Sequence, residues 1–248
     1  MNSYNYMLTI QYDGSRYHGW QSQNNTENTI QNKLETVLAG ILGYEVDIIG
    51  SGRTDAGVHA IAQTSNVHIR EEMDPGALMD ELNRYLPEDI AVTSVVRVDD
   101  RFHARYNAIS KTYRYRIHTG KYSNVFERKY VYPYKRKSLD VELMRSAASY
   151  IIGEHDFKAF CGNPRMKKST VRNVTNISIE EKDNEIVIEY TGNGFLQNMV
   201  RIMTGTLIEI GNGTKQVQDM KIIIESKDRQ QAGYTAPPNG LCLVRVIY

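Results

Sequence analysis

Eleven residues in the first half of the chain, GSGRTDAGVHA from Gly50 to Ala60, include side chains that can do chemistry. Three glycines surround an arginine, an aspartate and a histidine, and the stretch follows the apolar pattern of a short strand. Four structures use residues of these types: a phosphate-binding loop, a metal-binding loop, a tight turn, and a loop that presents a catalytic carboxylate.

Individual positions argue against the phosphate and metal structures. A P-loop needs a lysine directly after its last glycine, whereas Val58 follows Gly57. In the dinucleotide-binding fingerprint the third glycine would fall at Asp55, whose charge repels a pyrophosphate. Asp55 and His59 are both metal-ligand types, but no third ligand has a suitable spacing, so no metal site is expected.

A structural turn and a catalytic carboxylate both remain open from the residues alone. Asp and Gly favour turns for backbone reasons, which supports the turn. Arg53 supports the carboxylate, because a nearby cation keeps an aspartate such as Asp55 ionised in a cleft. Glycines at 50, 52 and 57 also permit unusual backbone angles and a close approach by a substrate.

The charges of the chain are segregated, although the net charge is only +1. Residues 1–100 carry 6 basic and 15 acidic side chains, a balance of −9. Residues 101–172 carry 17 and 5, a balance of +12, and residues 173–248 carry 7 and 9, a balance of −2. A positive field concentrated on one part of a surface favours binding to a polyanion.

The basic segment from Arg101 to Lys137 is also aromatic. It holds 11 Lys or Arg and one acid, Glu127. Nine aromatic residues are interleaved with them: Phe102, Tyr106, Tyr113, Tyr115, Tyr122, Phe126, Tyr130, Tyr132 and Tyr134. Cations neutralise phosphates and aromatic faces stack on unpaired bases, a combination that favours RNA.

Most of these aromatic residues are nevertheless expected to pack on one face of a strand, since strands favour tyrosine. The period of two places Tyr113 and Tyr115 on one face and Arg114 and Arg116 on the other, where they can meet phosphate. A second stretch without acids, Lys158 to Arg172, predicts a basic loop.

Two similar series of elements follow the chain and would position these residues. The first series has strands at 6–12, 46–49, 64–69 and 90–98, and helices at 30–42 and 77–86. The second has strands at 113–117, 176–180, 185–190 and 241–247, and helices at 139–152 and 195–210. Asn28 is the expected N-cap of the first helix, and Gly43 its expected end.

Each half therefore has the order β-α-β-β-α-β, which predicts an α+β fold built from two ferredoxin-like, split βαβ halves. Joined edge to edge, the halves would form one extended, mostly antiparallel sheet with helices on one face and a central active-site cleft. The expected domains are 1–104, which carries the Asp55 loop, and 105–248, which carries the basic and aromatic residues.

The sequence contains no signal for export or membrane insertion. No run of about 18 apolar residues occurs, and the first residues predict a strand rather than a signal peptide. Cys161 and Cys242 lie far apart with no CxxC pair, which suits reduced thiols in the cytoplasm. We therefore expect a cytoplasmic protein with no membrane partner.

GSGRTDAGVHA resembles the active-site motif of the TruA family of RNA pseudouridine synthases, which act on tRNA. The resemblance extends along the chain through YDGSRYHGWQSQ (12–23), TIQNKLE (29–35), RFHARYNAISKTYRYRI (101–117), GEHDFKAFCGN (153–163) and GFLQNMVRIMTG (194–205).

This resemblance implies a role for five residues. Asp55 matches the essential aspartate that acts on the target nucleotide, and Tyr113 matches the tyrosine that lies against the target base. Arg201 matches a basic residue that pairs with the aspartate, and Arg53 an arginine that helps to displace or replace the flipped nucleotide. Leu241 is expected to line the base pocket.

The implied reaction breaks the glycosidic bond of uridine and reattaches the ribose to carbon 5 of the same base. Atoms are conserved, so the resemblance implies no redox cofactor, metal or nucleotide. It further implies a homodimer that binds tRNA and flips uridines at about positions 38 to 40 of the anticodon arm.

Two alternatives belong to other classes of protein. One is a non-catalytic RNA-binding module in which Asp55 is only a turn residue. The other is a carboxylate-dependent hydrolase of a nucleoside or glycoside, which needs a second acid about 5–10 Å away.

Overall fold

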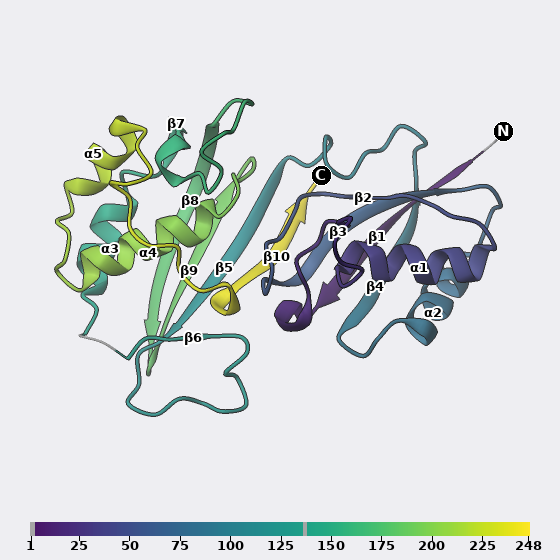
Figure 1. Cartoon of the computed structure of the whole chain (residues 1–248), viewed down its shortest axis with the longest axis horizontal. Coiled ribbons are helices and arrows are strands. Elements are labelled where there is room, and N and C mark those ends of the chain that lie inside the picture. The colour runs from purple at the N-terminus through teal and green to yellow at the C-terminus, as the bar shows by residue number, and fades with distance from the viewer. Residues whose placement is uncertain (1–2, 136–137) are drawn as a thin grey trace. The chain divides into compact units, whose positions relative to one another are not determined.

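The computed structural model describes residues 3–135 and 138–248, and it divides the chain into two compact units (Figure 1). The first unit comprises Met1–Ile109 and Cys242–Tyr248, and the second comprises Ser110–Leu241. The predicted domains, 1–104 and 105–248, stay a prediction; the compact units divide the chain differently at residues 105–109 and 242–248. Arg136 and Lys137 of the basic segment lie outside the described residues.

The first unit is a sheet with two helices. Its strands are β1 (Tyr4–Tyr12), β2 (Ile48–Gly50), β3 (His59–Ile69), β4 (Ile90–Val98) and β10 (Leu241–Ile247), and its helices are α1 (Ile30–Leu42) and α2 (Pro75–Tyr85). β1 lies between β4 and β3 and is antiparallel to both, while β2 pairs antiparallel with β3. This is the split βαβ arrangement that was predicted for the first half.

The last strand adds a pairing that was not predicted. β10 runs parallel to the start of β3, with Cys242 opposite His59 and Leu243 opposite Ala60. β3 is also longer than the predicted strand at 64–69, because it begins at His59, directly after the candidate loop.

Local sequence signals set the helix ends in the first unit. Thr29, not Asn28, is the N-cap of α1, and its side chain accepts the amide hydrogen of Asn32. The Asn28 prediction was wrong because that side chain donates instead to the carbonyl of Arg16. Gly43 ends the helix with a φ of 77°, as expected for a glycine C-cap.

The first unit buries apolar side chains between sheet and helices. In Figure 1, α1 and α2 lie side by side against this unit's strands, in agreement with their mutual contacts. The fully buried members include Tyr6, Leu8 and Ile10 from β1, Ile30, Leu34 and Leu38 from α1, and Leu78 and Leu82 from α2. Burial of this apolar surface is the main stabilising term for the unit.

Two fully buried asparagines, Asn5 and Asn66, lie on neighbouring strands of the same sheet. The side-chain Nδ2 of Asn66 donates to Asn5 Oδ1 (3.0 Å). Asn5 Nδ2 donates to the backbone carbonyls of Asp99 (3.0 Å) and Phe102 (2.9 Å). Ala104 N in turn donates to Asn66 Oδ1 (2.9 Å). These bonds satisfy buried polar groups and fasten residues 99–104 to the sheet.

Within its described residues, the second unit has five strands and three α-helices. Its strands are β5 (Ser110–His118), β6 (Tyr132–Pro133), β7 (Gly153–Asp156), β8 (Val171–Lys182) and β9 (Glu185–Gly192), and its helices are α3 (Val141–Ala148), α4 (Met199–Gly211) and α5 (Asp219–Ser226). The order β5-β9-β8-β7 is antiparallel throughout, and β6 pairs in parallel with β5. The α+β class with mostly antiparallel pairing is confirmed in each unit.

Two predicted helices in the second unit began too early, and one of them also ended too late. The helix predicted at 139–152 spans only Val141–Ala148, with Asp140 as its N-cap. The helix predicted at 195–210 begins at Met199, because Asn198 has a left-handed φ of 58° that interrupts a helix. β6, β7 and α5 were not predicted at all. Within the described residues, no helix has the length and apolarity needed to cross a membrane.

Two helical glycines should respond in opposite ways to alanine. A Cβ on Gly205 of α4 would lie 1.8 Å from the carbonyl oxygen of Tyr234, whereas a Cβ on Gly40 of α1 would meet nothing within 4 Å. We expect Gly205→Ala to lower the free energy of unfolding by about 2 kcal/mol or more, and Gly40→Ala to raise it by about 0.5–1 kcal/mol. Urea unfolding measures both, and a Gly205→Ala protein as stable as the parent would contradict this packing.

Candidate active site

The candidate loop, residues 51–58, connects β2 to β3 and presents Asp55 at the end of this hairpin. Its base is closed by Ser51, whose amide donates to the carbonyl of Thr64 (2.7 Å) and whose hydroxyl donates to Gln63 Oε1 (2.7 Å). Gln63 Nε2 donates to the carbonyl of Gly52 (2.9 Å). Asp55 is half-buried, while Arg53 is exposed. The 51–58 loop is therefore ordered from its base upward.

The first strand and the turn after it hold the top of the 51–58 loop. Thr54, directly before Asp55, shares a buried hydrogen bond with the Tyr12 hydroxyl (2.8 Å) and accepts the Trp20 amide hydrogen through its carbonyl (3.1 Å). After Asp55, the Gly57 amide donates to the carbonyl of Tyr17 (3.3 Å). Residues on both sides of Asp55 are thus bonded to the 12–20 segment, which limits where the carboxylate can go.

Close backbone packing explains the glycines of both segments. A Cβ on Gly14 would lie 2.0 Å from the carbonyl oxygen of Val58, and Gly57 has a φ of 76° that favours glycine. Gly50 makes room for the Trp20 indole, since a Cβ there would lie 2.5 Å from its nitrogen. The Val58 amide donates to the carbonyl of Asp55 (3.1 Å). The loop is therefore a tight turn that also presents a carboxylate.

Asp89 anchors the 12–20 segment from the start of β4. Its carbonyl accepts the Asp13 amide hydrogen (3.0 Å), and its carboxylate accepts the Tyr17 hydroxyl (2.5 Å) and the Arg16 guanidinium (2.8 Å). Burial, reinforced by the bond to Asp89, raises the pKa of Tyr17 above its ordinary value, so the hydroxyl remains a donor.

Arg53 is held by side chains from outside its own loop. Its Nε donates to Gln21 Oε1 (3.2 Å), and Gln21 Nε2 donates to Gln31 Oε1 (2.7 Å). Gln31 Nε2 donates in turn to Glu35 Oε1 (2.7 Å) on α1. This relay of amides holds an exposed guanidinium two residues from Asp55.

Tyr113, Arg201 and Leu241 belong to the second unit. Tyr113 is buried on β5, with its ring edge-on to Phe195 (5.3 Å between centroids). Arg201 of α4 donates from Nε to the carbonyl of Ala236 (2.7 Å) and from a terminal nitrogen to Asn198 Oδ1 (2.9 Å). Leu241 is buried at the start of β10. Tyr113 and Arg201 each contact residues of their own unit.

The predicted alternation along β5 is confirmed, but its arginines have partners on the protein. Tyr113 and Tyr115 are buried, while Arg114 pairs with Glu189 (2.8 Å) on β9. Arg116 pairs with Glu185 (2.5 Å) on β9 and with Glu127 (3.0 Å), contacts that raise the pKa of its guanidinium. The expectation that this face meets phosphate overlooked acids about 70 residues further along the chain.

One supporting residue in each unit, Tyr248 in the first and Phe195 in the second, was missed by sequence reasoning. Tyr248 donates to the carbonyl of Ala104 (2.8 Å); burial raises its pKa to about 12, while hydrogen bonds with Thr64 and Ser51 oppose the shift. Phe195 packs against Tyr113. No local sequence pattern marks either residue. By contrast, the glycines and aromatic residues of YDGSRYHGW are a sequence signal that could have indicated the close packing of this segment.

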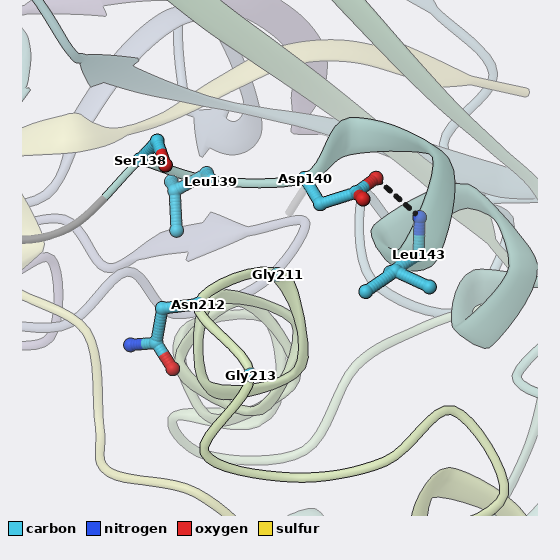
Figure 2. Close-up of a pocket in the computed structure, with 7 residues that line it drawn as sticks. All are labelled: Ser138, Leu139, Asp140, Leu143, Gly211, Asn212 and Gly213. Atoms are coloured by element: carbon cyan, nitrogen blue, oxygen red, sulfur yellow. Dashed lines mark hydrogen bonds between the residues drawn. The ribbon is translucent and has the colours of Figure 1, made fainter.

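The second unit has a surface pocket, but its lining does not make it an alternative candidate for the active site. Figure 2 shows it between the start of α3 and the end of α4, with a volume of about 500 Å³. It is lined by Ser138, Leu139, Asp140, Leu143, Gly211, Asn212 and Gly213, none of them cationic. The Asp140 carboxylate caps α3 by accepting the Leu143 amide hydrogen (3.1 Å). Across the described residues, no three His, Cys, Asp or Glu side chains gather in a way suited to a metal ion.

Comparison with known proteins decides the family. The family model described as tRNA pseudouridine synthase matches residues 8–107 and 147–248. The chain belongs to this family. The chain is 50% identical over 239 residues to a protein of Bacillus sp. (strain KSM-64) named tRNA pseudouridine synthase A, which covers 96% of this chain and 97% of that one. It is 44% identical to the protein of that name from Acetivibrio thermocellus, over 98% of this chain and 99% of that one.

The matched ranges include most of the candidate residues. Arg53, Asp55, Arg201 and Leu241 lie within the two matched ranges, and Tyr113 lies in the interval between them. The 12–20 segment and the 51–58 loop both fall within the first matched range, so the packing described above belongs to the part of the chain that defines the synthase family.

A methyl group at Gly14 should disturb the candidate active site without unfolding the protein. Because its Cβ would collide with the carbonyl of Val58, Gly14→Ala should displace the loop that carries Asp55. We expect kcat for pseudouridine formation in tRNA to fall by about 100-fold, the usual effect of a misplacement of about 1 Å. Circular dichroism should be unchanged, with Gly40→Ala as the control. Full activity in Gly14→Ala would show that this contact does not position the loop.

Proposed function

We propose that this tRNA pseudouridine synthase isomerises uridines in the anticodon arm of tRNA, at about positions 38–40, after flipping each base from its stack. The proposal gives the essential catalytic role to Asp55. One observation carries it: Asp55 is the half-buried carboxylate of a loop fixed on both sides by the 12–20 segment, within a range matched by the family model.

The reaction requires bond exchange at one ribose and one base. The bond between ribose C1′ and uracil N1 breaks, and a bond between C1′ and C5 forms, with the C5 proton moved to solvent and N1 protonated. A carboxylate can attack covalently, or it can stabilise charge and move a proton while a glycal forms. Asp55 suits both routes, because both require a carboxylate placed close to the ribose.

The remaining residues complete the proposal. Tyr113 would lie against the target base, and its burial against Phe195 supports a fixed ring. Arg53 would help to displace or replace the flipped nucleotide, and its exposed guanidinium, held by Gln21, suits that role. Arg201 would serve the catalytic aspartate as its basic partner, and Leu241 would line the base pocket.

The assembly and location of the enzyme are further parts of the proposal. We propose a cytoplasmic homodimer whose two subunits share the bound tRNA, which the segregation of charge into −9, +12 and −2 along the chain supports. Sedimentation of the purified protein at micromolar concentration would distinguish a dimer from a monomer.

Replacing the carboxylate should separate catalysis from binding. Asp55→Asn keeps the size of the side chain but removes its charge, so we expect less than about one-thousandth of the product with little change in tRNA affinity. The measurement is pseudouridine in the anticodon arm after incubation with unmodified tRNA transcript and no additives. Substantial turnover by Asp55→Asn would reject Asp55 as the essential group. Binding without any isomerisation by the unsubstituted protein would favour the RNA-binding module instead.

The basic loop predicted at 158–172 should contribute to tRNA binding. Lys167 is exposed there, unlike Arg114, whose charge is paired with Glu189. We expect Lys167→Ala to weaken tRNA binding and to reduce the slope of log affinity against log salt by about 1. Lys221→Ala, an exposed lysine of α5 beside Glu225, is the matched control. An unchanged slope in Lys167→Ala would place this loop off the binding surface.

A further inference from the structure

The structure divides the aromatic residues of the basic segment into buried and exposed sets. Tyr113, Tyr115 and Tyr134 are buried in the second unit. Tyr122 and Phe126 are instead 77% and 90% exposed, and both belong to the loop between β5 and β6, residues 119–131 (Figure 1). Single exposed aromatic residues are common, but this loop carries a third, Tyr130, which is 40% exposed. Tyr122 and Phe126, with Val125 58% exposed between them, form an apolar tip.

The 119–131 loop holds this tip outward with its own hydrogen bonds. Three bonds fix its backbone: Arg128 to the carbonyl of Val125 (2.5 Å), the Phe126 amide to Asn124 Oδ1 (3.0 Å), and His118 Nε2 to the carbonyl of Tyr122 (2.7 Å). At its end, Asn239 Nδ2 donates to the carbonyl of Val131 (2.7 Å). The exposed rings are thus carried by a backbone that is already ordered, which lowers the entropy cost of binding.

The charges around the tip favour a polyanion. Lys121, Arg128 and Lys129 flank the rings, and the Lys121 ammonium lies 5.3 Å from the centroid of the Tyr122 ring. Glu127 is the one acid between residues 119 and 131, and it is paired with Arg116 (3.0 Å). Exposed rings flanked by cations are how proteins bind unpaired nucleotides, with stacking on the rings and phosphates at the cations.

We propose that the 119–131 loop is an additional RNA-binding element that stacks Phe126 and Tyr122 on unpaired bases of the tRNA substrate. The proposal rests on the proposed function in taking tRNA as the ligand and Tyr113 as the residue beside the target base. The bases concerned differ from the target uridine, because Tyr113 and His118 are five residues apart on β5, about 17 Å along the strand. The loop lies in the interval between the two ranges matched by the family model, 8–107 and 147–248.

The test separates the effect of the aromatic ring from that of side-chain size at position 126. Phe126→Ala and Phe126→Leu remove the aromatic face, while Phe126→Trp keeps it. We expect both Phe126→Ala and Phe126→Leu to bind a fluorescent tRNA transcript about 5-fold or more weakly, and Phe126→Trp to bind like the parent. Binding to a fully paired RNA duplex should not change, since a duplex offers no unpaired base. Tyr85→Ala, which removes a 58% exposed tyrosine from the first unit, is the matched control.

Three outcomes would overturn the proposal. Unchanged tRNA affinity in Phe126→Ala would show that the ring lies outside the binding surface. Equal losses of affinity for tRNA and for the duplex would show that the loop contacts phosphates and not unpaired bases. A smaller species of Phe126→Ala in sedimentation would assign the tip to a second copy of the chain. Affinity is measured without turnover, so a parent protein that makes no pseudouridine but still shows this pattern would sink the proposed function and leave the loop proposal intact.

Discussion

The contact between the 12–20 segment and the 51–58 loop is the constraint on which the candidate active site depends. A loop of this length free at its tip would move among many backbone conformations, and fixing each residue costs about 1–2 kcal/mol of conformational entropy. The two bonds to Thr54 and the bond from Gly57 to Tyr17 offset part of that cost by placing the loop against an ordered turn. Only glycine at position 14 allows the backbones to approach so closely. Catalysis by a carboxylate depends on such placement, because reactivity falls steeply with misorientation.

Buried polar groups complete this support. Asp89 ties the 12–20 segment to β4, and Asn5 and Asn66 tie residues 99–104 to the sheet. Tyr248 adds bonds at the base of the loop. Each of these groups would cost free energy if left unpaired, so the network favours one arrangement of the strands over alternatives with shifted register. The arrangement of strands in the first unit is therefore determined by hydrogen bonds to buried polar groups as well as by packing of its apolar core.

Local patterns predicted the elements better than the contacts between them. The apolar spacing from Ile30 to Leu42 and the alternation from Tyr6 to Tyr12 predicted α1 and β1, because such periods reflect a single buried face. Glycine chemistry and the motif itself directed attention to Asp55. The partners of Arg114 and Arg116, the anchoring by Asp89, and the pairing of β10 with β3 were not predictable, since each joins residues far apart in sequence with no local signal. Asn28 shows the same limit at short range, where a contact with Arg16 took a capping residue away from its helix.

The parallel pairing of β10 with β3 has a consequence for how the protein is made. Residues 242–248 belong to the first compact unit, yet the ribosome reaches them only after it has synthesised the whole of the second. The start of β3, at His59 and Ala60, therefore lacks its β10 partner until Ser110–Leu241 has been synthesised. Exposed strand edges pair readily with other chains, and long-range closure is slow. The order of synthesis thus makes completion of the first unit a late event, which follows synthesis of the whole inserted second unit.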